Sequence, residues 1–330
     1  GDHVTLEAGT GLVHTAPDHG VEDFEVCKKY PDWHLEPIGT VGPDGKYTSA
    51  VPGYEGKFAL DMNVEMIKAL AASGALFAKG SLRHQYAHCW RCKNPIIYRA
   101  TEQWFSSVDG YRKKALEAID QVQWIPSWGH DRIYNMIRDR GDWCISRQRV
   151  WGVPIPIFYC REHNHAVITD ETIAHLQEIF AKEGSDAWWA HTEKELLPEG
   201  FKCPECGCTE FRKESDIMDV WFDSGCTHQG VLCHDPELAY PADMYLEGSD
   251  QHRGWFNSSL LTSVAANGIA PYKAVLTHGF TVDGEGRKMS KSVGNTVAPQ
   301  EVIDQYGADV MRLWVSSADY QGDVRLSPKI

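Results

Sequence analysis

The segment from Asp283 to Asn295, reading DGEGRKMSKSVGN, carries two lysines three positions apart, Lys288 and Lys291. Small hydroxylated residues accompany them, and glycines on both flanks favour a mobile loop. A lysine ammonium is a compact charge on a flexible stem, so such a loop can stabilise the charge of a polyphosphate. A solvated basic turn has the same composition, because charged runs are usually exposed faces. The segment alone leaves both interpretations open.

Cysteine and histidine residues in the middle of the chain have the spacing of a metal site. Two close pairs are separated by a stretch in which we expect a helix over Glu171–Lys182. In a chain of this size, such pairs favour zinc over disulfides. We predict a structural zinc, because four protein ligands leave no open position for a substrate. The predicted ligands are Cys160, His163, Cys203 and Cys206, with His165 or Cys208 as alternates.

A further pair, Cys89 and Cys92 in HCWRC, supplies only two of the four ligands that a structural zinc needs. No second pair lies near it in the sequence. The pair is either half of a site whose other ligands lie elsewhere or two ordinary reduced thiols.

Two other segments combine residue types that can bind ligands. Residues 3–24 alternate like a strand, pass two glycines and reach a cluster that includes His14, Asp18 and Asp23. This cluster can bind a polar ligand, or its aspartates can cap backbone donors of a loop. Residues 138–156 interleave arginines with tryptophans, which suits phosphate and stacking contacts. A surface strand with structural tryptophans explains the second segment equally well.

The final third of the chain contains the elements that would position the lysines. The pattern predicts a buried strand over Ala242–Gly248, a helix closed by Gly268 and a second buried strand over Ala274–Phe280. A strand, helix and strand of this length form a right-handed parallel crossover, and such sheets bind ligands at the carboxyl ends of their strands. The residues expected in that crevice, beside the lysines, are Glu247, Gly248, Asp250, Gln251, His278 and Gly279.

The first 85 residues read as a β-rich unit that ends in one helix, which Asp61 caps and Gly74 stops. Further along, we expect a strand over 96–105 and helices over Tyr111–Asp120 and His130–Arg140. The length of 330 residues suits two or three domains. The net charge of −14 argues against a nucleic-acid partner without excluding one, because contacts come from local patches. No long apolar run points to a membrane, and the ten cysteines suit a reducing cytoplasm.

With a nucleotide-shaped crevice and KMSKS on a loop, the chain resembles the class I aminoacyl-tRNA synthetases, and more specifically the isoleucyl-tRNA synthetases. The KMSKS signature is Lys288–Ser292. Further matching motifs are DVWFDSG, YLEGSDQHRGWF, LTHGF, RDRGDWCISRQRVWG and the editing motif GTGLVHTAP. The resemblance covers essentially the whole chain. It implies an α/β fold that is the second half of a class I Rossmann-type nucleotide-binding fold, with inserted α+β connective and editing segments and zinc knuckles.

The resemblance implies a role for each matching residue. Lys288 and Lys291 would stabilise charge on the phosphates of ATP, bound with Mg²⁺. Trp221 and Trp255 would wall the isoleucine side chain. The adenylate would contact Glu247, Gly248, Asp250, Gln251, His278, Gly279, Met289 and Ser290, and editing of mischarged valine would involve His14 and Asp23.

The domain layout and partners are implied in the same way. The layout would be an editing segment (1–85), connective insertions (86–235), the second half of the catalytic domain (236–295) and the start of a helical stem-contact region (296–330). The partners would be ATP, isoleucine and tRNA(Ile), in a cytoplasmic protein that is a monomer at full length.

Two motifs of the family do not occur in this sequence: the HIGH motif and the threonine-rich strand of the editing pocket. We therefore expect the 330 residues by themselves to be inactive in aminoacylation. The alternatives are a non-catalytic, zinc-stabilised RNA-binding module derived from a synthetase, and the valyl or leucyl relative.

Overall fold

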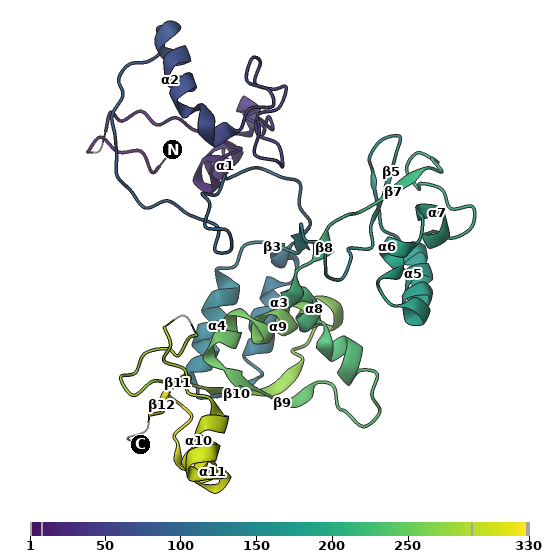
Figure 1. The fold of residues 1–330 in the computed structure, drawn as a ribbon. Coiled ribbons are helices and arrows are strands. Elements are labelled where there is room, and N and C mark those ends of the chain that lie inside the picture. The colour runs from purple at the N-terminus through teal and green to yellow at the C-terminus, as the bar shows by residue number, and fades with distance from the viewer. Residues whose placement is uncertain (1, 8, 292, 328–330) are drawn as a thin grey trace. The chain divides into compact units, whose positions relative to one another are not determined.

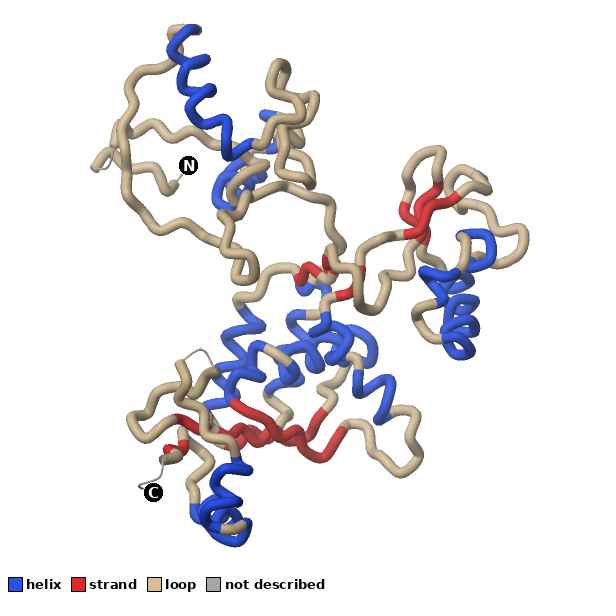
Figure 2. Tube along the Cα trace, in the orientation of Figure 1, coloured by secondary structure: helices blue, strands red, loops and turns tan. Residues whose placement is uncertain are grey.

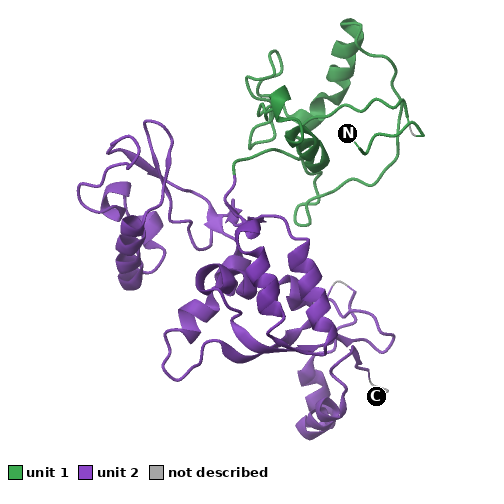
Figure 3. Ribbon diagram, turned by 180° about the vertical axis from the view of Figure 1, so that it is seen from behind, with its two compact units in different colours: residues 1–102 green, residues 103–330 purple. Residues whose placement is uncertain are grey.

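The computed structural model describes residues 2–7, 9–291 and 293–327 (Figure 1). Ser292, the last residue of the KMSKS motif, lies outside them. The chain divides into two compact units, residues 1–102 and 103–330 (Figure 3). None of the helices in the described ranges is long and apolar enough to cross a membrane.

The first unit contains more loop and helix than the sequence predicts. Its helices are α1 (Val21–Lys28) and α2 (Asn63–Ala72), with 3-10 turns η1 (Pro31–Trp33) and η2 (Ala59–Met62), and loops connect them (Figure 2). Among its described residues, β-pairing is limited to isolated bridges, so the expected β-rich unit is not observed. Gly9 and Gly11 both adopt left-handed φ angles, of 63° and 73°, which interrupt the extended run that alternation predicted.

Two other local predictions fail at their boundaries. Asp61 does not cap α2, because it lies inside the 3-10 turn η2 and the N-cap position is Met62. Gly74 does follow the helix in a left-handed conformation, with φ 76°, as a stop signal should. The strand expected over 96–105 is reduced to β1 (Phe105–Ser106), which pairs with β3 (Trp143–Cys144).

A three-stranded parallel sheet forms the centre of the second unit. Its order is β2 (Gln123–Ile125), β10 (Tyr272–His278) and β9 (Ala242–Gly248). The crossover from β9 to β10 runs through η5 (Ser249–Arg253) and α9 (Trp255–Asn267), which Gly268 ends with φ 75°. The predicted parallel crossover is therefore confirmed, although β10 begins and ends two residues earlier than predicted.

Helices cover one side of this sheet, as Figures 1 and 3 show from opposite directions. They are α3 (Arg112–Ile119), α4 (Trp128–Arg138), α8 (Val220–Gly225) and α9, with η3 (Val108–Gly110) before α3 and the π-helical turn η4 (His228–Leu232) after α8. The core between them includes Phe256, Leu260 and Leu261 of α9 with Tyr272 and Val275 of β10. The helices expected over Tyr111–Asp120 and His130–Arg140 are thus observed as α3 and α4.

A small subdomain has a hydrophobic core of its own, which includes Phe158, Leu176, Trp188 and Phe211. Its antiparallel sheet has the order β6 (Ala166–Val167), β5 (Phe158–Cys160) and β7 (Phe211–Lys213). Its helices are α5 (Asp170–Glu183), α6 (Ala187–Ala190) and α7 (Glu193–Leu196), so the helix expected over Glu171–Lys182 is confirmed. The antiparallel pair β4 (Ser146–Arg147) and β8 (Ile217–Met218) lies where the chain enters and leaves it.

The last element group follows β10 directly. The strand β11 (Thr281–Val282) pairs in parallel with β12 (Val324–Arg325). Between them lie the KMSKS loop, α10 (Pro299–Tyr306) and α11 (Ala308–Ser317). The loop is therefore attached to the end of the central strand of the sheet.

Candidate functional site

The carboxyl ends of β9 and β10 form the candidate nucleotide crevice. Gly248 pairs with His278 and Glu247 pairs with Thr277, so the carboxyl ends of the two parallel strands lie side by side. A Cβ atom on Gly248 would lie only 2.8 Å from Asp250 Oδ1 and 3.5 Å from His278 Cε1. Because Gly248 has no side chain, a ligand can approach its backbone between the side chains of Asp250 and His278. The structure brings these predicted residues together.

Gln251 and Gly279 take structural roles at the same edge. The side-chain oxygen of Gln251 accepts a hydrogen bond of 2.8 Å from the backbone N–H of Trp255, which begins α9. Its amide nitrogen donates to Asp250 at 3.4 Å. Gly279 packs against Gly322, and a Cβ atom there would lie 2.1 Å from the carbonyl oxygen of Gly322. Both positions fix the backbone near the carboxyl ends of the two strands.

The two tryptophans predicted to contact the amino acid lie at the start of α8 and α9. The Trp255 ring stacks on Tyr245 with centroids 3.9 Å apart, and its Nε1 donates to the carbonyl of Ser224 at 3.0 Å. Trp221 is 43% exposed, and its ring carbons lie 2.9 Å from the position of a Cβ on Gly254. Trp255 is thus fixed, while Trp221 presents an open aromatic face.

Asp219 fixes the start of α8, a role that the motif DVWFDSG did not reveal by itself. One carboxylate oxygen accepts a hydrogen bond from Trp221 N at 3.2 Å. The other accepts from Trp143 Nε1 at 3.1 Å and from Arg147 Nη2 at 2.9 Å. Burial, with the Asp219 charge, raises the pKa of Asp223 in the same helix to about 6.

In the basic and aromatic segment 138–156, some residues have structural roles and others are accessible to a ligand, as the two interpretations respectively expect. Trp143 is buried and Arg147 pairs with Asp219, which are structural roles. Arg140 lies over the Trp143 ring, 5.4 Å from its centroid. Trp151 is 92% exposed and Arg149 is also exposed, so both side chains are accessible to a ligand. Arg138 at the other end is exposed as well, but it pairs with Asp139 at 2.7 Å.

The KMSKS loop presents both lysines to solvent. Lys288 forms an antiparallel bridge with Val282 through its backbone. Within the described part of the chain, neither its ammonium group nor that of Lys291 forms an ion pair or hydrogen bond. Met289 and Ser290 between them are half-buried. The loop therefore offers two uncompensated positive charges.

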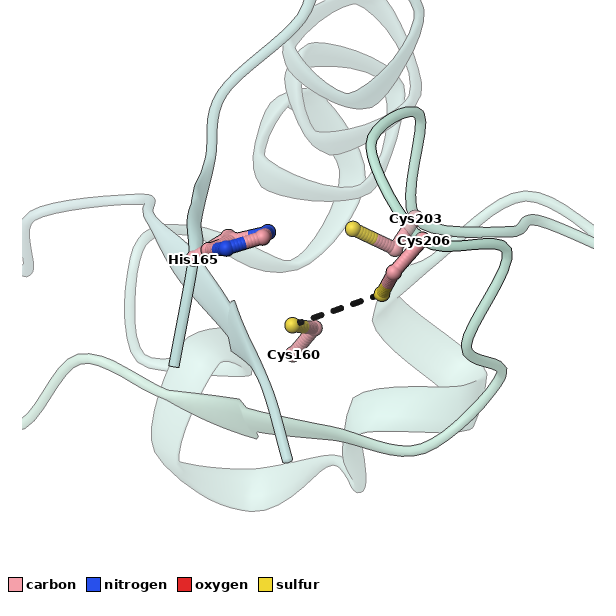
Figure 4. Close-up of side chains that lie close together, drawn as sticks. All are labelled: Cys160, His165, Cys203 and Cys206. Atoms are coloured by element: carbon pink, nitrogen blue, oxygen red, sulfur yellow. Dashed lines mark hydrogen bonds between the residues drawn. The ribbon is translucent and has the colours of Figure 1, made fainter. Parts of the chain in front are cut away.

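Four side chains of the small subdomain converge as a candidate metal centre (Figure 4). The ligand atoms of Cys160, His165, Cys203 and Cys206 all lie within 4.8 Å of one another. The group contains the three predicted cysteines, with the predicted alternate His165 in place of His163. In the hairpin from β5 to β6, the Cys160 N–H donates to the carbonyl of His165 at 3.0 Å, so residue 165 lies beside Cys160. His163 lies instead in a second group with Glu162 and Cys206, in which both His163 and Glu162 are exposed.

The donor set fits zinc. Tetrahedral zinc with bonds of about 2.3 Å to sulfur separates two thiolates by about 3.8 Å, and Cys160 Sγ and Cys206 Sγ lie 3.8 Å apart. Glu205 Oε2 lies 2.8 Å from His165 Nδ1, where it can orient the ring. Cys208, the other alternate, turns to the backbone of Glu210 instead. Burial opposes ionisation of Cys160, but hydrogen bonds from the backbone of His163 and His165 lower its pKa.

This geometry predicts which histidine holds the metal. We expect the purified protein to contain zinc, and His165→Ala to lower its zinc affinity by more than about 10-fold. His163→Ala is the matched control and should leave the zinc content unchanged. Elemental analysis after dialysis against a graded chelator measures both. Equal loss from the two variants would contradict the assignment.

The Cys89 and Cys92 pair forms a tight turn. Cys89 N donates to the carbonyl of Asn94 at 2.8 Å, and Lys93 adopts φ 62°. Hydrogen bonds from Cys92 and Arg91 lower the pKa of the Cys89 thiol. Within the described ranges, no further His, Cys, Asp or Glu completes a metal group with the pair. Both explanations of this pair remain predictions.

The aspartates near the N-terminus cap backbone donors, as one of the two interpretations expects. Asp23 accepts a hydrogen bond from Ala16 N at 2.8 Å. Asp18 is buried and accepts from Ile38 N at 3.0 Å and from Gly39 N at 2.6 Å. His14 is exposed. Asp18 is therefore a structural residue of this loop.

Comparisons with known proteins agree on one family. Residues 14–327 match the family model of tRNA synthetases class I (I, L, M and V). The isoleucine-tRNA ligase of Moorella thermoacetica is 62% identical over 330 residues, which is 100% of this chain and 35% of the relative. That of Desulfitobacterium hafniense strain DCB-2 is 64% identical over 330 residues, again 100% of this chain and 35% of the relative. The chain thus spans about a third of the length of these curated relatives.

Similarity to solved structures is weaker. A Mycobacterium tuberculosis methionyl-tRNA synthetase in complex with methionyl-adenylate matches with a TM-score of 0.47 and 17% identity, over 93% of this chain and 53% of that one. The family match by itself covers nearly all of the sequence, and the mixed α/β fold is that of the class. The chain belongs to the class I tRNA synthetases of the I, L, M and V group.

Proposed function

We propose that this chain is the part of an isoleucine-tRNA ligase that holds the adenylate and supplies the KMSKS loop. The observation that carries the proposal is that Gly248 and His278 lie together at the carboxyl ends of β9 and β10. The chain then continues from β10 into a loop on which Lys288 and Lys291 have no side-chain partner among the described residues. A parallel sheet binds ligands at this edge, and free ammonium groups suit the phosphates of ATP. The relatives named isoleucine-tRNA ligase support the choice of amino acid.

The proposed reaction has two steps. The carboxylate of isoleucine attacks the α-phosphate of ATP, which is bound with Mg²⁺, and pyrophosphate leaves with the bonding electrons. A hydroxyl of the terminal adenosine of tRNA(Ile) then attacks the acyl carbon, and AMP leaves. Lys288 and Lys291 stabilise the negative charge that develops on the departing pyrophosphate. In this proposal, Glu247 and Asp250 accept hydrogen bonds from ribose hydroxyls or the ammonium group.

Selection of the amino acid follows from the same arrangement. Trp221 and Trp255 wall the side chain, and an apolar wall separates isoleucine from valine by only about 1–3 kcal/mol. A hydrolytic editing site is therefore needed for high fidelity, and we place it in the first unit, at His14 and Asp23. One carboxylate oxygen of Asp23 binds Ala16 N, and within the described residues the other accepts no hydrogen bond, which leaves it available for an ammonium group.

The remaining segments take supporting roles in this proposal. Residues 1–85 belong to the editing segment, 86–235 to connective insertions with the zinc centre, 236–295 to the catalytic domain and 296–330 to the stem-contact region. The zinc is structural, because its three cysteines and one histidine complete a tetrahedral set.

Pyrophosphate exchange tests the proposal. We expect the full-length protein to catalyse ATP–pyrophosphate exchange that depends on isoleucine, weakly on valine and not on methionine. The 330 residues alone should show no exchange, because the HIGH motif with which the family binds ATP is absent from this sequence. Exchange that depends equally on leucine or valine would assign the chain to the leucyl or valyl relatives. Isoleucine-dependent exchange by the 330 residues alone would contradict the claim that the active site also needs the HIGH motif, which this sequence lacks.

A further inference from the structure

Asp283 lies five residues before Lys288 and organises the first turn of the segment Asp283–Asn295 that carries the KMSKS motif. Its Oδ1 accepts hydrogen bonds from the backbone N–H groups of Glu285, at 3.0 Å, and Arg287, at 2.8 Å. Its Oδ2 accepts from Arg287 Nε at 2.9 Å. Its own N–H donates to the carbonyl of Arg287 at 2.9 Å, which closes the turn. Lys288 therefore leaves this turn in a defined register.

Asn295 stands after the loop and reaches back across it. Its side-chain oxygen accepts a hydrogen bond from Ser290 N at 2.9 Å. Its amide nitrogen donates to the carbonyl of Lys288 at 3.1 Å and to Asp283 Oδ2 at 3.0 Å. One amide thus binds the backbone on both sides of Met289 and the carboxylate that starts the loop. We call Asp283 and Asn295 the clasp.

The clasp binds the backbone of the loop without using the ammonium groups of its lysines. Hydrogen bonds, first that from Asn295 and then those from Arg287 and Glu285, hold the pKa of Asp283 well below its usual range, so the carboxylate is ionised at neutral pH. Its partners are backbone N–H groups, a neutral amide and Arg287, which also pairs with Glu285 at 3.1 Å. Neither Lys288 nor Lys291 is used to neutralise it. Both ammonium groups stay available while the backbone between them is held.

Resting on the function proposed above, we propose that Asp283 and Asn295 are positioning residues for Lys288 and Lys291. They fix the backbone from which the two ammonium groups extend, so that both meet the same pyrophosphate in the transition state. Misplacement of a catalytic group by about 1 Å can cost roughly 100-fold in rate. Loss of the clasp should therefore lower kcat and leave isoleucine binding unchanged, because the tryptophan wall lies on α8 and α9.

The test uses the full-length protein and ATP–pyrophosphate exchange. Asn295→Asp keeps the acceptor for Ser290 N but places a second carboxylate against Asp283 and removes the donor to Lys288. We expect kcat to fall by about 10- to 100-fold, with KM for isoleucine within about twofold and an unchanged melting temperature. The double variant Asp283→Asn with Asn295→Asp restores a donor and an acceptor between the two positions, and should recover at least about fivefold of the lost kcat. Thr296→Ala, at an exposed neighbour with no side-chain hydrogen bond to described residues, is the control.

A second measurement separates failure of this inference from failure of the proposed function. Limited trypsinolysis followed by mass spectrometry reports cleavage after Lys288 and Lys291, and it does not depend on activity. We expect Asn295→Asp to accelerate that cleavage at least about 10-fold and Thr296→Ala to leave it unchanged. If wild-type protein shows no exchange, the proposed function fails, and the cleavage rates still decide whether the clasp holds the loop. An active Asn295→Asp enzyme, or parallel changes in kcat, KM and melting temperature, would overturn the positioning role.

Discussion

Replacing Lys288 by alanine in the full-length protein is expected to slow isoleucyl-adenylate formation by roughly 10²- to 10³-fold, the loss seen when one preorganised charge-stabilising donor is removed. The exposed ammonium group of Lys288 has no partner among the described residues, so its removal leaves no buried group unsatisfied. Isoleucine contacts the tryptophans and not the loop in our proposal, so its KM should change little. Single-turnover formation of the adenylate, measured with saturating isoleucine, gives the rate.

Lys273→Ala is a matched control for this effect. Lys273 is also an exposed lysine, but it lies near the start of β10, at the end of the strand away from the loop, and pairs with Asp243 at 2.7 Å. Its loss should leave adenylate formation unchanged. If Lys288→Ala weakened isoleucine binding as much as it slowed the reaction, a transition-state role for the lysine would be wrong.

The second large effect is expected at Asp23. Asp23→Ala should let valyl-tRNA accumulate, to about one product in 10 to 200 at equal amino acid concentrations, because one methylene gives only that discrimination in the synthetic site. Transfer of isoleucine should continue at its normal rate. The charged tRNA is assayed after incubation with ATP and equal concentrations of isoleucine and valine.

A comparison of two variants distinguishes editing from a structural role. Asp23→Asn keeps an oxygen that can accept the hydrogen bond from Ala16 N but removes the charge. If the carboxylate binds the ammonium group of a mischarged ester, Asp23→Asn misacylates as Asp23→Ala does. Glu22→Gln, at the exposed neighbouring carboxylate, should behave as wild type. Misacylation by Asp23→Ala alone would make Asp23 a loop residue and remove it from the editing site.

The parallel crossover, and the end of the sheet at which its two strands finish together, were predictable because strong local signals agree. The strand Ala242–Gly248 was predicted with its observed bounds, and Gly268 ends α9 because only a left-handed residue fits there. The carboxyl ends of adjacent parallel strands must meet, so Gly248 and His278 could be placed together without coordinates. By contrast, β2 has only three residues, and periodicity cannot identify so short a strand.

The contacts that shape the site depend on how the folded chain turns back on itself, which the spacing of residues in the sequence does not reveal. His163 has the more usual spacing after Cys160, but the antiparallel turn brings His165 to the cysteines. Asp219, Asp283 and Asn295 each act through hydrogen bonds to residues whose positions the fold decides. The loop flanked by glycines reads as mobile from sequence, whereas Asp283 and Asn295 form hydrogen bonds to the backbone of Glu285, Arg287, Lys288 and Ser290.

A crystal structure of the full-length protein with a non-hydrolysable isoleucyl-adenylate analogue tests the central claim most directly. We predict that the adenosine lies across the carboxyl ends of β9 and β10, against Gly248 and His278, with the isoleucyl side chain between Trp221 and Trp255. The linkage that replaces the phosphate should face the loop that carries Lys288 and Lys291. An analogue bound away from this edge of the sheet would contradict the account.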